Sequence, residues 1–499
     1  MALDSHILTI LEPSIKLEEM KAPNAGEGVS GKNFSGLGAG GEVPHIRING
    51  YMFALDDIKS FNLNLNGQYP ELTMKITDVQ DSFTVDRFPR DGDLLNLRIE
   101  LDEAGTYKDI RMDFNILEFR GIPTGAADKA RGKSMYSVRA IAKIPGMYTD
   151  ECKSYGENSS LEHVKAIATD LKMGVATNVG ETEDVMRRFC AYQTKLETLA
   201  NTVLHSYISD DAFLTYCIDP YYYINFVNLQ KVFNAPNDVD IHEAIANTNL
   251  GDNGSQEPKD GKGTKEVDLI LTNSHKADGF NTHIIKHALV NNSTKIALEN
   301  GYKRKMQYFD VDENEFDLVE FDIESLTSSN IKDIEEPLKG RRNSDVDEYN
   351  THIKQKYVGI QNDNTHLNYK YAAINNIQNM VELDKLYLEV ELGQLNPAIY
   401  KYMKIPVAIY NYGKINNTVA NEHNKEKRDG DFQPEADKLA GEPQTGDTEK
   451  SEGTQFTLDE FLSAHYIVMG IQYKYTPLTG YTQVLKLARR EWPARLNNM

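Results

Sequence analysis

The chain has 499 residues, a formal net charge of −21 and a hydrophobic fraction of 40%. This length is sufficient for roughly two to four domains with their own cores. The acidic excess argues against a surface that binds nucleic acid by neutralising phosphates, because such a surface needs a stripe of Lys and Arg side chains. Any contact with DNA is therefore expected to be non-adhesive.

The cysteines and the N-terminus indicate a protein that folds in a reducing cytoplasm and is soluble when made. Cys152, Cys190 and Cys217 are odd in number and too widely spaced for a CxxC ligand pair or a disulfide framework. The first residues have an acidic start and a short apolar run broken by Pro13, without the cleavage site of a signal peptide. No apolar run reaches the roughly 20 residues that span a bilayer.

Residues 1–43 are expected to form an N-terminal arm and linker. The stretch from 21 to 43 is rich in Gly and nearly free of large apolar side chains, so it cannot bury enough surface to fold alone. We do not interpret its GLGAGG segment as a phosphate-binding loop, because the segment precedes the first strand and no Lys-Ser/Thr pair follows it.

Residues 44–148 are predicted to form a first small antiparallel β-barrel. In FNLNLNG, Phe61, Leu63 and Leu65 alternate with Asn residues, which places one face in a core and one in polar surroundings. Similar stretches repeat this pattern and are separated by turn-forming segments such as NGQYP and PRDGD. Several short strands without an intervening helix are typical of a barrel or a sandwich.

Residues 149–234 are predicted to form a helical connector followed by an aromatic hairpin. Ser159 and Glu162 have capping-box spacing before one amphipathic helix, and TKLETLANTVLHSY repeats this arrangement before a second. The stretch CIDPYYYINFVNLQKVF indicates a strand, a tight turn and a second strand. Its aromatic side chains favour a half-buried pleated surface, and Tyr is also common where one protein contacts another.

Residues 235–410 are predicted to form a second β-barrel region with insertions. Its strand candidates are VDLILTNS, STKIALENG, KRKMQYFDV, YKYAAINNIQN, DKLYLEVEL and MKIPVAIYN. Residues 411–455 are charged and rich in Gly and Asn, and are expected to be a mobile insertion. Residues 456–499 contain HYIVMGIQYKYTPLTGYTQVLKLARREW, which predicts a hairpin that closes the second barrel before a C-terminal tail.

The histidines do not form a recognisable metal site. His283 and His287 are four residues apart, with His275 upstream. The residues between them lack the Glu of a metalloprotease helix, and the surrounding NTHIIKHALV is as easily a strand. Surface or packing histidines are the simpler interpretation.

The sequence also lacks a complete calcium loop and the common catalytic motifs. Asp310 and Asp312 resemble the start of a calcium loop, but Glu315 stands where that loop requires Gly. No GxSxG, SxxK or catalytic-Cys signature is present. Paired carboxylates for glycoside hydrolysis need only spatial proximity, which a sequence does not test. We therefore expect no enzyme activity, no cofactor and no metal site.

Three stretches carry a resemblance to a known family. They are RINGYMFALDDIKSFNLNLNGQYPELTMKITD, ETLANTVLHSYISDDAFLTYCIDPYYYINF and HYIVMGIQYKYTPLTGYTQVLKLARREWP. Together with the order of the predicted elements, they resemble the baseplate hub protein of contractile-tailed bacteriophages. The same scaffold occurs in late control proteins of other phages and at the base of type VI secretion spikes. The likeness spans residues 45–493 and supplies no catalytic residues.

The resemblance implies a mainly β protein with two antiparallel β-barrel domains of tail-tube type, joined by a small helical and hairpin segment. It implies a homotrimeric ring that adapts a sixfold tail tube to a threefold central spike and leaves a channel for DNA. The implied partners are tail tube proteins, a central spike with or without a lytic enzyme, and baseplate wedge proteins, without stable membrane insertion. The implied location is the tail baseplate of the virion, after assembly in the host cytoplasm.

Within this resemblance, the aromatic hairpin supplies the candidate interface. Alternation along its second strand predicts that Tyr222, Ile224 and Phe226 face a core. The side chains of the opposite face are the candidate contacts with a neighbouring subunit or the tail tube. They are Tyr221, Tyr223 and Val227.

Two alternatives stay open. A spike-base protein of a type VI-like secretion or contractile injection system belongs to the same structural class. A glycan-binding or glycan-hydrolysing β-sandwich protein belongs to a different class and should expose aromatic platforms, whereas Trp492 is the only Trp. The acidic charge fits either an anionic ring lumen or simple solubility.

Overall fold

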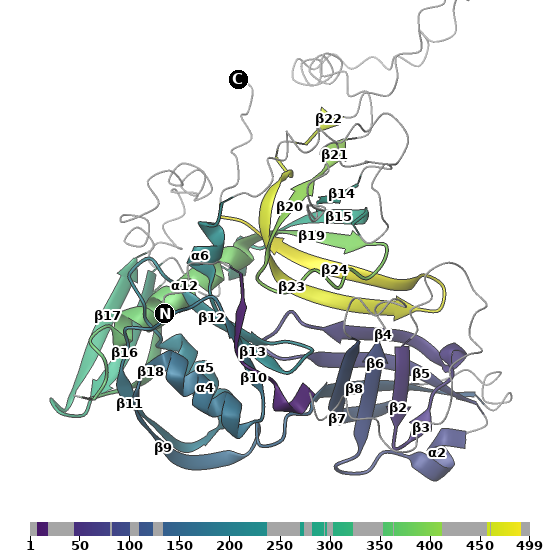
Figure 1. The fold of residues 1–499 in the computed structure, drawn as a ribbon, viewed down its shortest axis with the longest axis horizontal. Helices are drawn as coiled ribbons and strands as arrows, with labels where there is room; N and C mark the ends of the chain where they lie inside the picture. Colours follow the sequence, from purple (N-terminus) through teal and green to yellow (C-terminus); the bar gives the residue numbers. More distant parts are fainter. Residues whose placement is uncertain are drawn as a thin grey trace, which may run out of the picture.

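The protein is described by a computed structural model over these residues: 7–17, 44–79, 82–99, 109–122, 133–236, 270–273, 282–293, 295–296, 303–322, 353–362, 364–411, 457–459 and 461–490. In these ranges the chain is mainly β, with one sheet of 13 strands, smaller sheets and few helices (Figure 1). The predicted mainly β class is confirmed. The Gly-rich stretch 21–43 and residues 412–455 of the predicted insertion lie outside the described residues.

The first β unit lies between residues 44 and 142. Its strands are β2 (Pro44–Ile48), β3 (Tyr51–Met52), β4 (Ile58–Asn64), β5 (Glu71–Val79), β6 (Leu94–Ile99), β7 (Ile110–Ile122) and β8 (Lys133–Ala142), with η1 (Leu55–Asp57) and α2 (Ser82–Arg87) between them. They follow the order β4-β5-β8-β7-β6-β2-β3. Phe61, Leu63 and Leu65 are buried, as their alternation predicted.

The connector between the β units is an α/β segment. Its elements are β9 (Asp150–Asn158), α4 (Ser160–Asp170), β10 (Gly174–Thr177), β11 (Met186–Thr194), α5 (Lys195–Leu204), β12 (Leu214–Ile218), β13 (Tyr223–Asn228) and α6 (Leu229–Phe233). Strand β1 (Thr9–Glu12) joins its sheet in the order β1-β10-β13-β12. Both predicted helices are confirmed, and Thr194 and Glu197 form the reciprocal capping box of α5.

The second β unit contains the closing hairpin. Its strands are β14 (Leu271–Thr272), β15 (Ile284–Asn291), β19 (Leu386–Leu392), β20 (Lys404–Ala408), β23 (Ala464–Thr476) and β24 (Gly480–Ala488), with the small pair β21 (Tyr410–Asn411) and β22 (Thr457–Leu458) beyond them. The predicted hairpin on both sides of PLTG is confirmed as β23 and β24. Strands β16 (Lys303–Asp310), β17 (Glu315–Asp322) and β18 (Ile353–Gln361) form a separate side sheet next to α12 (Tyr369–Lys385).

Two predicted strands are wrong. YKYAAINNIQN begins the helix α12, and its residues 372–376 are all buried instead of alternating with exposed ones as in a half-buried strand. Its Tyr, Ile and Asn content had suggested a strand. The candidate STKIALENG is also not a strand where it is described, since Ser293, Lys295 and Ile296 are helical.

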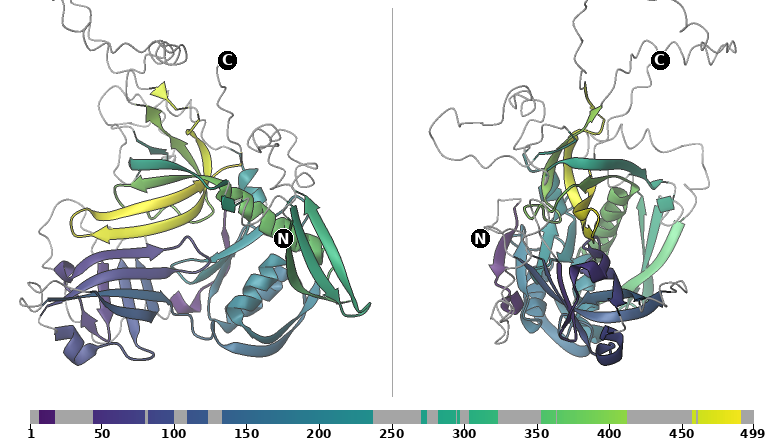
Figure 2. Two further views of the ribbon diagram at one scale, coloured as in Figure 1. Left: turned by 180° about the vertical axis from the view of Figure 1, so that it is seen from behind. Right: turned by 90° about the vertical axis from the view of Figure 1, so that its right-hand side faces the viewer.

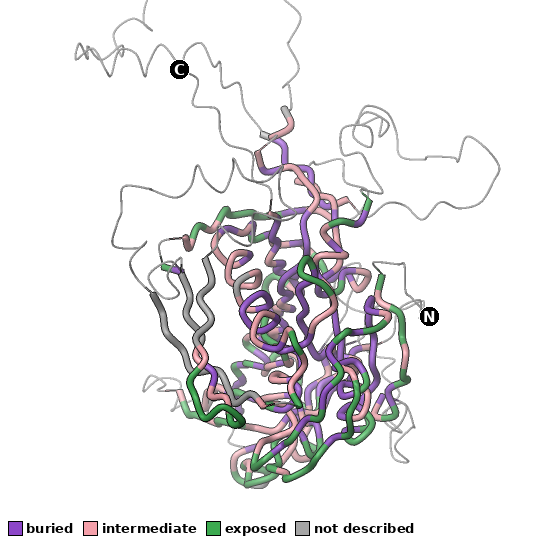
Figure 3. Tube along the Cα trace, turned by 90° about the vertical axis from the view of Figure 1, so that its left-hand side faces the viewer, coloured by how far each residue is buried: buried purple, intermediate pink, exposed green. Residues whose placement is uncertain are grey.

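The two β units are joined by direct strand pairing. Strand β23 pairs with β4 in antiparallel register from Gln472 opposite Asn64 to Tyr475 opposite Phe61, and the hairpin lies along the first unit (Figure 2). The N–H of Leu65 also donates to the backbone oxygen of Ile471 at 2.8 Å. Sequence-distant strands therefore share one sheet, and buried positions run through the interior of both units and the connector (Figure 3).

The 13-stranded sheet branches at β23, where β20 and then β14 leave the main path, and Thr272 of β14 bridges to His283, directly before β15. Its main path runs from β15 to β3, and these end strands do not pair with each other in the described residues. The described strands therefore do not show closed barrels, and the two predicted tail-tube barrels stay a prediction. Among the described helices, none combines the length and apolar character needed to cross a bilayer.

Candidate functional site at the junction of the three units

The aromatic hairpin is built around Asp219. Its Oδ1 accepts hydrogen bonds from the backbone N–H groups of Tyr221 and Tyr223, each at 2.9 Å. The N–H of Tyr222 donates to the backbone oxygen of Asp219 at 3.2 Å. Tyr222 has a φ of 62°, in the left-handed region that a bulky side chain rarely adopts. The hydrogen bonds to the Asp219 carboxylate thus hold the turn in which Tyr222 adopts this strained conformation.

The inner face of the hairpin packs as predicted. Tyr222, Ile224 and Phe226 are fully buried, in the core formed with α4 and α5. The Tyr222 hydroxyl also accepts a hydrogen bond from the Asp113 N–H of β7 at 3.0 Å. One aromatic side chain therefore fixes the connector to the first β unit.

The outer face is not the free surface that its sequence suggested. Val227 is fully buried against Tyr402, Ile467 and Met469 of the second β unit. Its side chain does not reach solvent, so the prediction that Val227 contacts a neighbouring molecule is corrected. The physical reason is that the hairpin is covered on both faces, by helices on one side and by the second β unit on the other.

Tyr221 and Tyr223 are only partly buried. Both line a groove of about 310 Å³ whose other walls include Ile7, Ile10 and Tyr400. Ile7 and Ile10 are 55% and 60% exposed, so the groove mouth is apolar and open to solvent. The groove is the place where the two predicted tyrosines could meet another molecule.

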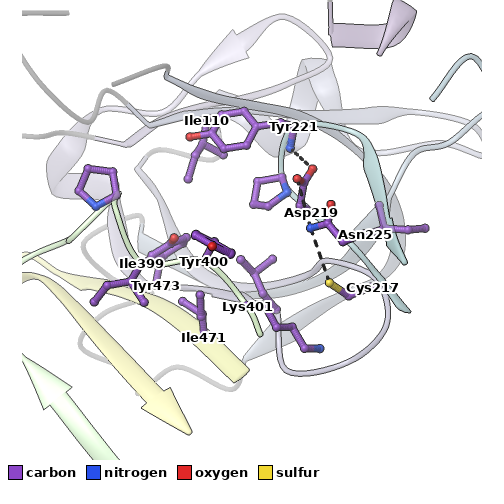
Figure 4. Close-up of a pocket in the computed structure, with 14 residues that line it drawn as sticks. Ile110, Cys217, Asp219, Tyr221, Asn225, Ile399, Tyr400, Lys401, Ile471 and Tyr473 are labelled. Atoms are coloured by element: carbon purple, nitrogen blue, oxygen red, sulfur yellow. Dashed lines mark hydrogen bonds between the residues drawn. The ribbon is translucent and has the colours of Figure 1, made fainter. Parts of the chain in front are cut away.

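A smaller cavity of about 70 Å³ (Figure 4) adjoins this groove, since Asp219, Tyr221, Asn225 and Tyr400 line both. It is enclosed by all three units. The first β unit contributes Leu65 and Ile110, the connector contributes the segment 217–221 and Asn225, and the second β unit contributes Ile399, Lys401 and Tyr473. The cavity marks the junction of the three units.

The junction contains buried ionisable groups. Burial raises the pKa of the Asp219 carboxyl to about 6, although the N–H groups of Tyr223 and Tyr221 partly oppose this shift. Burial also raises the pKa of the Cys217 thiol to about 11. Burial lowers the pKa of the Lys401 ammonium group. These shifts disfavour charge on each group. They are unlike those of a reactive nucleophile, whose charged form is favoured, and they are typical of side chains packed between structural units.

Lys401 ties the second β unit to the first. Its ammonium group donates to the backbone oxygens of Asn66 at 2.8 Å and Gly67 at 2.6 Å, in the turn between β4 and β5. The connector contacts the same turn, because the Ile218 N–H donates to the Gln68 oxygen at 2.7 Å. The Tyr216 hydroxyl donates to Gln68 Oε1 at 2.9 Å. The β4–β5 turn is therefore shared by all three units, a role that the sequence did not signal.

The remaining candidates for chemistry lie apart from this junction. His283 and His287 are on or next to the edge strand β15, as the strand interpretation expected, and His275 lies outside the described residues. The Asp310 carboxylate accepts hydrogen bonds from the N–H groups of Asp312 and Glu313 and so stabilises the β16–β17 turn. No group of three or more metal-binding side chains is found in the part of the chain that the structure describes. Trp492 lies outside that part.

No protein-family model and no curated protein matches this chain. Among solved structures, a tail protein from Neisseria meningitidis is similar at 8% identity, with 90% of this chain and 96% of that chain covered and a TM-score of 0.43. The 43 kDa tail protein of prophage MuSo2 from Shewanella oneidensis is similar at 9% identity, with 90% and 99% covered and a TM-score of 0.44.

A third similar structure is an E. coli component of the type VI secretion system, described as structurally similar to the T4 phage tail proteins gp27 and gp5. It shares 8% identity over 90% of this chain and 78% of its own, with a TM-score of 0.38. All three TM-scores lie below 0.5, so these similarities are too loose to assign a role to this chain.

Proposed function

We propose that this chain is a structural baseplate hub subunit of a contractile tail and acts as a homotrimeric ring. The observation that carries the proposal is the pairing of β4 with β23. It joins two β units from opposite ends of the sequence into one sheet whose main path ends at β3 and β15. The sequence resemblance to baseplate hub proteins supports the same function.

The ends of this main path favour assembly with further chains. Strand β15 is exposed at six of its eight positions, including Ile285 at 44% and Leu289 at 39%. In the described residues β15 (Ile284–Asn291) pairs along one edge with β19, and only the residue before it, His283, bridges to Thr272 of β14. Uncovered edge strands with apolar side chains associate with other strands unless something covers them. A closed ring covers such edges without allowing open-ended growth.

Three copies with two β units each would present six similar units around one axis. This number matches a sixfold tail tube, while the threefold symmetry of the ring itself matches a central spike. We assign the tail tube, the central spike and baseplate wedge proteins as partners. In this assembly the chain has no enzyme activity, and its net charge of −21 lets DNA pass through the channel without adhering.

The groove beside the hairpin is the second contact that we propose. Tyr221 and Tyr223 present partly buried rings there, and Tyr is favoured at contacts because it combines a large apolar ring with a polar tip. In the proposed assembly these two tyrosines contact a neighbouring subunit or the tail tube. Val227 has no part in this contact, because it is buried inside the chain.

The edge of β15 gives a direct test by analytical ultracentrifugation. Ile285→Lys together with Leu289→Lys places two charges on the exposed edge and should abolish the trimer while the chain remains folded. Val311→Lys is the matched control, because Val311 is 50% exposed in the β16–β17 turn, away from the end of the large sheet. A trimer that survives the double substitution would contradict the assignment of β15 to the ring.

A further inference from the structure

A buried group of polar side chains lies where the connector meets α12 and the side sheet. His205 follows α5, is fully buried, and stacks flat on Tyr369 with ring centroids 3.9 Å apart. Its Nδ1 lies 3.0 Å from the backbone oxygen of Asn201. Because a carbonyl can only accept, Nδ1 carries the hydrogen and Nε2 is bare. Nε2 is buried and has no hydrogen-bond partner among the described residues.

His366 is fixed in the same way. Its Nε2 lies 2.8 Å from the backbone oxygen of His205, so Nε2 carries the hydrogen and donates it. Its Nδ1 is then bare, buried and without a partner in the described part of the chain. Each of these two histidines therefore keeps one unprotonated ring nitrogen in a site that excludes water.

The charged groups around these nitrogens disfavour a positive charge on either histidine. Arg188 of β11 is 7% exposed, donates from Nη2 to Ser160 Oγ at 2.7 Å, and acts electrostatically on both histidines. The Asp184 carboxylate acts to raise the pKa of His366. It already accepts hydrogen bonds from the N–H groups of Ser160 and Tyr207. The other titratable side chains packed around the group are His163 of α4, whose Nε2 lies 3.1 Å from the Met186 oxygen, Tyr207, Tyr308 of β16, Tyr369, Lys370 paired with Asp317, and Tyr371.

Burial is the main cause of the resulting pKa shifts. It lowers the pKa of His205 to about 3, and the positive charge of Arg188 acts in the same direction. Burial also lowers the pKa of His366 and of Arg188. The closed structure therefore disfavours the charged form of both histidines, and each gains affinity for a proton when water reaches it.

Among the residues whose burial is described, the core at this place is a small separate cluster. Met186, Tyr308, Tyr369, Ala373 and Ile374 form a small core cluster that is separate from the larger cores of the β units and the connector. Such small clusters open more readily than a large core. The next turn of α12 is held firmly: Asn376 donates to the backbone oxygens of Leu204 and Ser206 and accepts from the Leu214 N–H.

We propose that the contact of the connector with the start of α12 and with β16 is an acid-operated joint. Proton uptake by His205 and His366 opens it, while the 13-stranded sheet and the Asn376 contacts stay in place. This inference does not depend on the proposed hub function.

Proton linkage gives the expected size of the effect. A histidine that is neutral in the closed state and has the usual pKa of about 6.5 in the open state raises the opening constant about 8-fold between pH 6 and pH 5. Two such histidines raise it by at most about 60-fold over the same interval. Carboxylates contribute less in this interval because their usual pKa values lie near 4.

Hydrogen exchange of the full chain, followed by mass spectrometry at pH 6 and pH 5, measures this opening. After correction for intrinsic exchange rates, amides of residues 303–310 and 369–374 should open up to about 60-fold more at pH 5, while amides of β23 and β24 change little. His205→Phe keeps a flat ring on Tyr369, and His366→Gln keeps a donor for the His205 oxygen. Each should reduce the response to about 8-fold, and the double variant should keep only the smaller response of the remaining titratable groups.

His287→Gln is the matched control, because His287 is exposed on β15 and should leave the 60-fold response unchanged. If His205→Phe weakens β23 and β24 protection, His205→Gln replaces it. A wild-type response near 1-fold, or a double variant that responds as strongly as the wild type, would overturn the proposal.

Discussion

The ammonium group of Lys401 lies 2.8 Å from the backbone oxygen of Asn66, although these residues belong to opposite ends of the sequence. It also reaches the Gly67 oxygen at 2.6 Å. A buried cation thus satisfies two carbonyls of the β4–β5 turn, and the same turn receives contacts from the connector. The arrangement of the three units depends on this small turn.

Replacing Lys401 by Met should destabilise the protein by about 1–3 kcal/mol, because two carbonyl oxygens lose their donor in a dry junction. Chemical denaturation of the two proteins measures the difference. Lys286→Met is the control, since Lys286 is 74% exposed in its side chain and should change stability little. Equal free energies of unfolding for Lys401→Met and the wild type would show that the contact is dispensable.

Asp219 should give stability a distinctive pH dependence. Its folded pKa of about 6 lies above the usual value of 3.8, so its contribution is fully present below pH 3.8 and is lost as the pH rises through about 6. Asp219→Asn keeps acceptors for the turn but does not titrate. We expect the variant to be at least as stable as the wild type at pH 7.

The measurement is the free energy of unfolding at pH 7, 6 and 5 for both proteins. The difference between variant and wild type should shrink as the pH falls, because the wild-type carboxyl then becomes protonated. A constant difference across these three pH values would mean that Asp219 is charged throughout, and the burial argument would fail.

Gly174 should not tolerate a side chain. A Cβ there would lie 2.4 Å from the Tyr223 ring and 2.8 Å from the backbone oxygen of Glu12. Gly174→Ala is expected to cost about 1–3 kcal/mol and to push Tyr223 into the groove. In Gly121→Ala the new Cβ meets only Tyr136 at 3.9 Å, which is an ordinary contact, so this variant is the control.

Thermal denaturation and tyrosine fluorescence together check this expectation. A Gly174→Ala variant as stable as Gly121→Ala would show that β1 and Tyr223 can move aside freely.

Arg490 should resist conservative replacement. Its guanidinium lies 4.8 Å from the ring centroids of both Phe213 and Phe233, and it donates to Asn379 Oδ1 at 2.9 Å and to Gln230 Oε1. Burial lowers its pKa to about 10. Lys has no planar guanidinium to stack on the two rings and to bond both partners. Arg490→Lys should therefore lower the free energy of unfolding by about 1–2 kcal/mol.

Urea denaturation of Arg490→Lys measures this loss, with Arg187→Lys as the control on the exposed side of β11. If both substitutions change the free energy of unfolding equally, the stacking of Arg490 on the Phe213 and Phe233 rings contributes nothing measurable.

Local signals predicted much of the fold. Capping residues placed both connector helices, and alternation placed Tyr222, Ile224 and Phe226 in a core. The start of α12 was misread because Tyr369 and Ile374 favour strands, whereas the segment is a helix with residues 372–376 all buried.

The junction was harder to predict because its contacts connect distant residues. Nothing near Val227 in the sequence shows that Ile467 and Met469 cover it, so a buried residue looked like a surface one. The same holds for Lys401 and the β4–β5 turn, and for the pairing of β4 with β23. These contacts depend on tertiary packing, which a local pattern does not encode.

The central claim is that the chain assembles as a threefold ring. Native mass spectrometry of the purified 56.4 kDa chain over a concentration series tests it most directly. The account predicts a species with three times the chain mass that becomes dominant as the concentration rises. A monomer that persists over the whole series would contradict the ring.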